Sequence, residues 1–228
     1  FFGGKAAPGY YIAKETIRLI CAVADVVNHD PNTNKMLKVV FIENFGVSIG
    51  EVVYPAADVS EQISTASKEA SGTGNMKFMM NGAITLGTMD GANVEIHEAV
   101  GGDEHCVIFG LTAEKVMDYY ANGKYSAWDE YNNNESVRRV LDRLVDGTYG
   151  DFRSLFDYLL QNNDEFFILK DFDAYREGHE EIMRRYRDRE GWNRSMLMNI
   201  AASGRFSSDR TIEEYANDIW HLKPIHVV

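Results

Sequence analysis

The chain is short of cysteine, of basic residues and of long apolar runs, and each shortage argues against a class of protein. Two cysteines among 228 residues argue against a disulfide-rich scaffold. The 23 Lys and Arg residues are outnumbered by 35 Asp and Glu, and the net charge of −12 argues against nucleic acid or an anionic membrane as a partner. No apolar run approaches the ~20 residues that a membrane-spanning helix needs.

The two cysteines lie in apolar stretches, Cys21 in LICAV and Cys106 in HCVIF. Buried, reduced thiols in a cytoplasmic protein account for such surroundings better than a disulfide or a metal-ligating pair. We therefore expect two buried free thiols, a cytoplasmic location and no metal.

The first 125 residues alternate between helix and strand patterns. Apolar residues recur at three- and four-residue steps over 10–28, which predicts an amphipathic helix. The continuous apolar run at 37–42 predicts a strand that is buried on both faces. Further strands are expected at 84–86 and 106–109, further helices at 47–53, 75–81, 92–99 and 112–121, and an irregular segment at 57–68. This order predicts an α/β fold, with a parallel, Rossmann-like sheet, right-handed crossovers and helices on both faces.

Strand patterns end near residue 125, and residues 126–228 are expected to be mainly helical. Ser126 with Asp129, and Thr211 with Glu214, have the spacing of capping boxes that open helices. The charged cluster at 184–189 is typical of a solvated helix face. A chain of this length is one domain by default, so we expect a single domain over 1–228 with a βα core at 1–125.

The segment 69–82, EASGTGNMKFMMNG, carries the strongest functional signal. Small residues at 71–74 would let backbone N–H groups approach a phosphate closely, and the start of the following helix adds partial positive charge. Lys77 lies about one helical turn beyond this loop. The apolar residues around Lys77 would desolvate its ammonium form, which favours a neutral, nucleophilic amine. A neutral lysine beside a phosphate-binding loop is what a Schiff base with pyridoxal phosphate requires.

The glycine spacing does not fit two common phosphate motifs. Gly72-x-Gly74-x-x-Lys77 has lysine where the dinucleotide-binding fingerprint needs a third glycine. It also lacks the Gly-Lys-Ser/Thr ending of the P-loop. By spacing alone, a glycine-rich turn before a helix is most often ordinary turn chemistry.

The full string, however, resembles the lysine segment of the glycogen (α-glucan) phosphorylases. The similarity extends to five other blocks in the family's order: GGKAAPGY at 3–10, DVVNHDP at 25–31, PAADVSEQIST at 55–65, TLGTMDGANVE at 85–95 and NIAASGRFSSDRTIEEYANDIW at 199–220. The resemblance implies the C-terminal domain of the two-domain GT-B architecture. It also implies transfer of a glucosyl unit from an α-1,4-glucan to orthophosphate, which yields α-glucose 1-phosphate with retained configuration.

Site residues follow from the resemblance, position by position. Lys77 would carry pyridoxal 5'-phosphate, whose own phosphate exchanges a proton with the substrate phosphate in this family. Thr73 and Gly74 would donate to the cofactor phosphate. The segment Glu69, Ala70, Ser71 and Gly72 would hold the glucose hydroxyls, with Glu69 as acceptor and the three following backbone N–H groups as donors.

Three further positions depart from the family pattern or leave an alternative open. Phe45 and Gly46 follow the expected strand at 37–42, where the family's loop approaches the cofactor. Better-known members have a tyrosine and, in animals, an arginine there, so Phe45 keeps a ring but no hydroxyl and Gly46 offers no cation. Lys5 could be a phosphate lysine, although a tight strand-to-helix turn explains it better.

The opening Phe1-Phe2-Gly3-Gly4 reads as the end of a strand whose beginning is missing. We therefore expect the chain to be the last quarter of a phosphorylase and to be inactive by itself. Its partner would be the missing N-terminal part of the same protein, and the complete protein would be a homodimer. Two alternatives compete: a nucleotide-sugar glycosyltransferase of the same architecture, which needs no cofactor lysine, and a non-catalytic remnant that binds or assembles.

Overall fold

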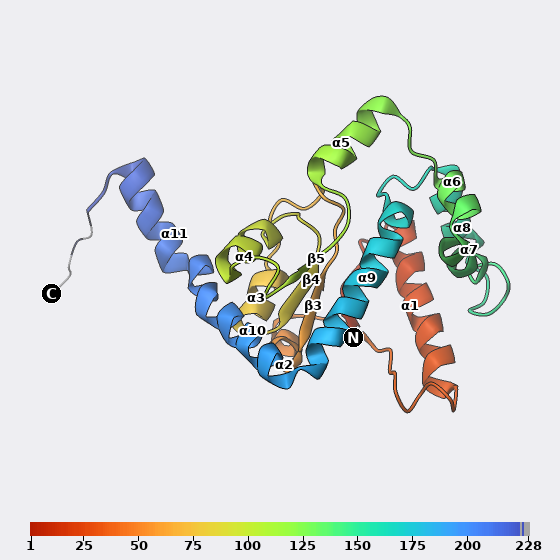
Figure 1. Ribbon diagram of the computed structural model, residues 1–228, viewed down its shortest axis with the longest axis horizontal. Helices are drawn as coiled ribbons and strands as arrows, with labels where there is room; N and C mark the ends of the chain where they lie inside the picture. The colour runs from red at the N-terminus through yellow and green to blue at the C-terminus, as the bar shows by residue number, and fades with distance from the viewer. Residues whose placement is uncertain (224, 226–228) are drawn as a thin grey trace. The chain divides into compact units, whose positions relative to one another are not determined.

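The computed structural model describes residues 1–223 and 225, and the chain divides into two compact units. The first unit contains residues 1–52 and 116–173, and the second contains residues 53–115 and those from 174 onward. Three helices run from one unit into the other: α2 (Val47–Ala56), α5 (Ala113–Asn122) and α9 (Ile168–Arg187). Figure 1 gives the order of the elements along the chain.

The first unit combines a two-stranded parallel sheet with helices. Strand β1 (Phe2–Gly3) pairs with β2 (Phe41–Ile42), with Phe2 opposite Phe41. The helices contained wholly in this unit are α1 (Tyr11–His29), α6 (Ala127–Asn133), α7 (Glu135–Asp142) and α8 (Arg153–Gln161). Helix α1 packs on α8, and the Arg18 guanidinium lies 3.9 Å from the centroid of the Phe152 ring.

A buried carboxylate organises the aromatic core of the first unit. Asp164 accepts hydrogen bonds from the Tyr125 hydroxyl at 2.7 Å and from the Leu169 N–H at 2.8 Å. Burial raises the pKa of the Asp164 carboxyl above its ordinary value. The rings of Tyr119, Tyr120 and Tyr125 surround Phe167, with centroids between 4.8 and 5.5 Å away.

The second unit contains a three-stranded parallel sheet in the order β3-β4-β5. Its strands are β3 (Val59–Gln62), β4 (Ile84–Gly87) and β5 (Val107–Ile108). Helix α3 (Gly74–Met80) connects the first two strands, and α4 (Asn93–Val100) connects the second two. After α9 come α10 (Arg189–Ala202), η1 (Ser203–Phe206), α11 (Ser208–Glu214) and η2 (Tyr215–Trp220).

Alternate residues of a strand point to opposite faces of a sheet, so both faces of this sheet carry side chains. Helices cover each of the two faces. On one face Ile84, Leu86 and Val107 pack with Ile182 of α9 and Trp192 of α10. On the other face the buried cluster is Met79, Ile96, Val100 and Cys106, from α3, α4 and the residue just before β5. Figure 1 shows α3 and α4 on one side of the strands and α9 on the other. The expected α/β fold with parallel strands is confirmed.

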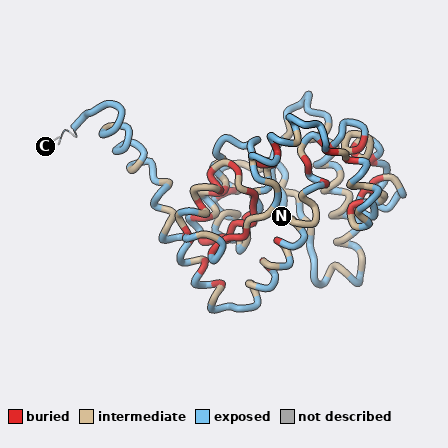
Figure 2. The backbone as a smooth tube through the Cα atoms, turned by 45° about the horizontal axis from the view of Figure 1, so that its top comes forward, coloured by how far each residue is buried: buried red, intermediate tan, exposed pale blue. Residues whose placement is uncertain are grey.

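The α11–η2 segment makes no contribution to the core. Neither element contains a buried residue, and the C-terminal end of the chain is mostly pale blue in Figure 2. No helix within residues 1–223 and 225 is both long and apolar enough to cross a membrane.

Several local expectations were wrong, and tertiary contacts explain the differences. The run at 37–42 is a strand only at Phe41–Ile42, and Leu37 is 50% exposed instead of buried. Residues 59–62, expected to be irregular, form β3 because they pair with β4. Helix α2, expected at 47–53, continues to Ala56 and contains Pro55 in its last turn.

Of the two expected helix N-caps, the one at Ser126 is confirmed and the one at Thr211 was wrong. Ser126 accepts a hydrogen bond from the Asp129 N–H at 3.1 Å and caps α6, as expected. Thr211 does not open a helix, because the extended Ser207 is already the N-cap of α11 and accepts from the Arg210 N–H. Thr211 instead donates its hydroxyl to the Ser207 carbonyl one turn earlier.

The cysteines are both free, but only Cys106 is buried. Cys21 lies on α1, a helix without a fully buried residue, so the expectation that it is buried was wrong. Burial raises the pKa of the Cys106 thiol to about 12.

Candidate functional site around Lys77 and the loop 64–72

Lys77 lies in the middle of α3, one turn after the small-residue loop. Its backbone N–H donates to the carbonyl of Thr73, the N-cap residue, at 3.2 Å. Gly72 has φ +85°, a left-handed conformation that glycine adopts without strain, and it turns the chain into the helix. The predicted order of loop, helix and lysine is therefore present.

The Lys77 side chain is exposed, so its expected apolar enclosure was wrong. Asn75 and Met79 occupy the core-facing side of α3, and Met79 is 0% exposed. Lys77 is two positions from each of them, and two residues rotate a helix by about 200°, which directs it away from the core. The amine nitrogen lies 5.6 Å from the centroid of the Tyr54 ring, which in turn packs edge-on against Phe78.

The start of α3 leaves donors available for a phosphate. The Thr73 side chain makes no capping hydrogen bond to the helix. A Cβ placed on Gly74 would meet no atom within 4 Å, so this backbone is open to close approach. An accessible amine, a hydroxyl not used in capping and an open backbone position fit a phosphorylated aldehyde such as pyridoxal 5'-phosphate.

A polar pocket of about 130 Å³ lies beside this loop. Glu69, Ser71 and Gly72 line it, whereas Ala70 is exposed and is not part of the lining. The Ser71 N–H donates to the Glu69 carboxylate at 3.4 Å. The structure thus brings three of the four expected sugar-binding positions to one pocket wall.

The turn after β4 supplies residues that the sequence analysis did not assign. Asp90 lines the same pocket, is 5% exposed and accepts three hydrogen bonds from the loop 64–69. Its signal in the sequence was the Asp-Gly pair shortly after a predicted strand, which marks a turn but does not show what the turn contacts.

Two buried asparagines join α3 to the same turn. The Asn75 side-chain amide donates to Asn93 Oδ1 at 3.1 Å. Asn93 donates in turn to the carbonyls of Gln62 and Thr88, both at 3.0 Å. These bonds fix the lysine helix relative to the ends of β3 and β4.

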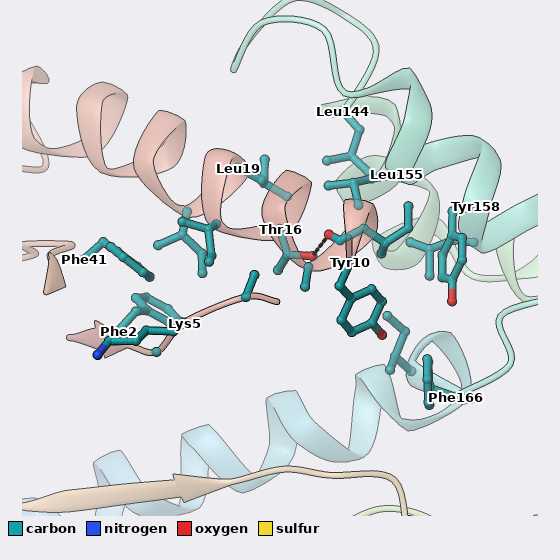
Figure 3. A pocket seen from close by; sticks show the side chains of 18 of the residues that line it. Phe2, Lys5, Tyr10, Thr16, Leu19, Phe41, Leu144, Leu155, Tyr158 and Phe166 are labelled. Atoms are coloured by element: carbon teal, nitrogen blue, oxygen red, sulfur yellow. Dashed lines mark hydrogen bonds between the residues drawn. The ribbon is translucent and has the colours of Figure 1, made fainter. Parts of the chain in front are cut away.

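Phe45, Gly46 and Lys5 belong to the first unit, whereas Lys77 belongs to the second. The Phe45 ring packs over Gly3, where an added Cβ would lie 2.9 Å from it. The Gly46 carbonyl accepts the Gly50 N–H in the first turn of α2. Lys5 lines a largely apolar pocket of about 580 Å³ with Tyr10 and Tyr158 (Figure 3). The expected cofactor roles of Phe45 and Gly46 stay predictions, and Lys5 lies in the connection between β1 and α1, which is the position that the favoured turn explanation gives it.

The cluster at 184–189 is only partly a solvated face. Arg185 is 23% exposed and donates to the carbonyls of Asp103, Glu104 and Cys106. It therefore ties α9 to the turn before β5. Within residues 1–223 and 225 no group of three or more His, Cys, Asp or Glu side chains could hold a metal ion.

Comparison with known proteins gives matches along almost the whole chain. A family model described as carbohydrate phosphorylase matches residues 1–222. Glycogen phosphorylase of Bacillus subtilis is 55% identical over 98% of this chain, and that of Synechocystis is 52% identical over 98%. The muscle form of human glycogen phosphorylase is 48% identical over 97%. The chain spans 28%, 27% and 27% of the lengths of these relatives. It therefore belongs to the carbohydrate phosphorylase family.

Proposed function

We propose that this chain is the cofactor-bearing part of an α-glucan phosphorylase. The reaction transfers a glucosyl unit from α-1,4-glucan to orthophosphate and yields α-glucose 1-phosphate with retained configuration. One observation carries the proposal: the exposed Lys77, the Thr73 hydroxyl that is not used in capping and the open backbone at Gly74 follow a loop that lines a polar pocket. The glycogen phosphorylases that it resembles support the same assignment.

Lys77 would hold pyridoxal 5'-phosphate through its Nζ, and Thr73 and Gly74 would donate to the cofactor's phosphate. When bound, the cofactor supplies a phosphate that exchanges a proton with the substrate phosphate. Phe45 would contribute a ring wall, and Gly46 leaves the backbone as the only donor at its position. Two neighbouring phosphates repel each other, so donors preorganised by the protein are what such a site needs.

The residues of the loop would hold the sugar. Glu69 would accept from a glucose hydroxyl through its carboxylate, and the backbone N–H groups of Ala70, Ser71 and Gly72 would donate. Glu69 would act by binding and orientation and would not transfer the proton.

The remaining proposals concern the architecture and the setting. We infer that residues 1–228 form a C-terminal GT-B domain with a Rossmann-like βα core at 1–125 and a helical part at 126–228. The complete protein would be cytoplasmic and homodimeric. Because the chain spans 27–28% of its relatives' lengths, we propose that the rest of such a protein completes the site and that the 228 residues alone do not turn over.

The test replaces Lys77 in the full-length natural protein that carries this chain. Borohydride reduction with pyridoxal 5'-phosphate should add the mass of the reduced cofactor to the peptide containing Lys77. Lys77→Ala and Lys77→Arg should lose both the label and phosphorolysis, whereas Lys115→Ala, at an exposed lysine of α5, should keep both. Turnover close to that of the parent protein in either Lys77 variant would refute the assignment.

A further inference from the structure

We propose that Asp90 is a positioning residue that sets the geometry of the sugar-binding loop without touching the sugar. This inference rests on the function proposed above, because it assigns the loop 64–72 to the glucosyl unit. The observation behind it is a set of contacts between two loops that are adjacent in space and more than twenty positions apart in the chain.

The Asp90 carboxylate is directed into the loop. Its Oδ1 accepts the Ser67 N–H at 2.9 Å. Its Oδ2 accepts the Ser64 hydroxyl at 2.7 Å and the Glu69 N–H at 2.9 Å. Charge-assisted hydrogen bonds of this kind are roughly twice as strong as neutral ones. Both carboxylate oxygens are thus occupied by the loop.

Neighbours of Asp90 hold the loop at both ends. The Thr88 hydroxyl donates to the Ser64 carbonyl at 2.6 Å. The Ala92 N–H donates to the Ser71 carbonyl at 2.7 Å. Asp90 therefore fixes the middle of a segment whose ends are already tied to the same turn.

The middle of the loop needs this support because its backbone is strained. Ser67 has φ +78°, an uncommon conformation for a residue with a Cβ, and its N–H is one of the three donors to Asp90. Without a charged acceptor the loop would relax toward ordinary backbone angles. Glu69, two residues later, would then move with it.

Loss of the Asp90 contacts should affect binding of one part of the substrate and not of the other. The Glu69 N–H is held by Asp90, and the Glu69 carboxylate lies on the pocket wall. Displacing this residue should weaken binding of the glucosyl unit and leave binding of the remaining glucan chain unchanged. A loss of folded enzyme would have another signature, because it lowers apparent kcat and leaves KM unchanged.

Asp90→Asn in the full-length natural protein tests the inference. The amide keeps the shape of the carboxylate but places an NH₂ group against a loop N–H or hydroxyl donor. KM for glucose 1-phosphate should rise about tenfold, KM for maltoheptaose should stay within about twofold, and labelling of Lys77 by the cofactor should be unchanged. Asp103→Asn is the matched control, because the Asp103 carboxylate is exposed and pairs with His97 of α4, whereas the Asp90 carboxylate is buried against the loop 64–72.

A second variant covers the case in which Asp90→Asn does not fold. Ser64→Ala removes one of the three donors and leaves the carboxylate in place, and KM for glucose 1-phosphate should rise about two- to threefold. An unchanged KM for glucose 1-phosphate in both variants, or a fall in kcat alone, would overturn the positioning role. If Lys77→Ala keeps its activity, the proposed function itself fails, whatever the Asp90 variant does.

Discussion

Gly91 and Ser71 approach so closely that a Cβ on residue 91 would lie 2.5 Å from the Ser71 carbonyl oxygen. Gly91 also has φ +51°, in the left-handed region. The loop 64–72 and the turn after β4 can therefore meet only if residue 91 has no side chain. This contact explains why a glycine is needed at that position of the TMDGAN block.

Gly91→Ala should reduce the free energy of unfolding by about 3 kcal/mol, because it adds a backbone clash to the cost of a left-handed alanine. Urea denaturation followed by circular dichroism measures the change.

Gly101→Ala provides the matched control. Gly101 also has a positive φ, +90°, but an added Cβ there would meet no atom within 4 Å. This variant should lose only about 1–2 kcal/mol, the cost of the backbone conformation alone. Equal losses in the two variants would show that the Ser71 contact does not matter.

Glu181 should make the stability of the protein depend on pH in the acidic range. Hydrogen bonds from Arg184 and then Arg185 lower the pKa of the Glu181 carboxyl to about 2. An unfolded glutamate has a pKa of about 4.3. The stabilising contribution is therefore complete above about pH 4.3 and is lost as the pH falls from there through about 2.

The difference in unfolding free energy between the parent chain and Glu181→Gln should accordingly be constant near neutrality and shrink below about pH 4. Glu177→Gln, which removes a carboxylate from an exposed position of the same helix, is the matched control. A difference that grows on acidification would contradict the assigned pairing.

The two cysteines should differ in reactivity. Cys21 is exposed, whereas Cys106 is buried and has its pKa raised to about 12, mainly by burial. A thiol-reactive disulfide at about pH 8 should therefore modify one thiol in the native chain and two after denaturation. Cys21→Ser should bring the native count to zero. A native count of two would mean that the region around Cys106 opens readily.

Much of the second unit could be predicted from local patterns. The helix at 75–81, the strand at 84–86 and the helix at 92–99 appear within one or two residues of their expected bounds. Periodicity works here because each element places its apolar side against the same sheet. The strand β3 was missed because Ser60, Glu61 and Gln62 are polar, and only pairing with β4 makes them a strand.

The sequence alone determined the family-like string around Lys77, the order of loop, helix and lysine, and the alternation that gives a parallel α/β sheet. Only the tertiary structure decided that Lys77 is exposed, that Cys21 is exposed and that Asp90 holds the loop 64–72. The physical reason is the distance along the sequence between the residues that interact. Local patterns report hydrogen bonds and burial within a turn or a strand, whereas the bonds from Asp90 to Ser64, Ser67 and Glu69 join positions that become neighbours only when parallel strands align.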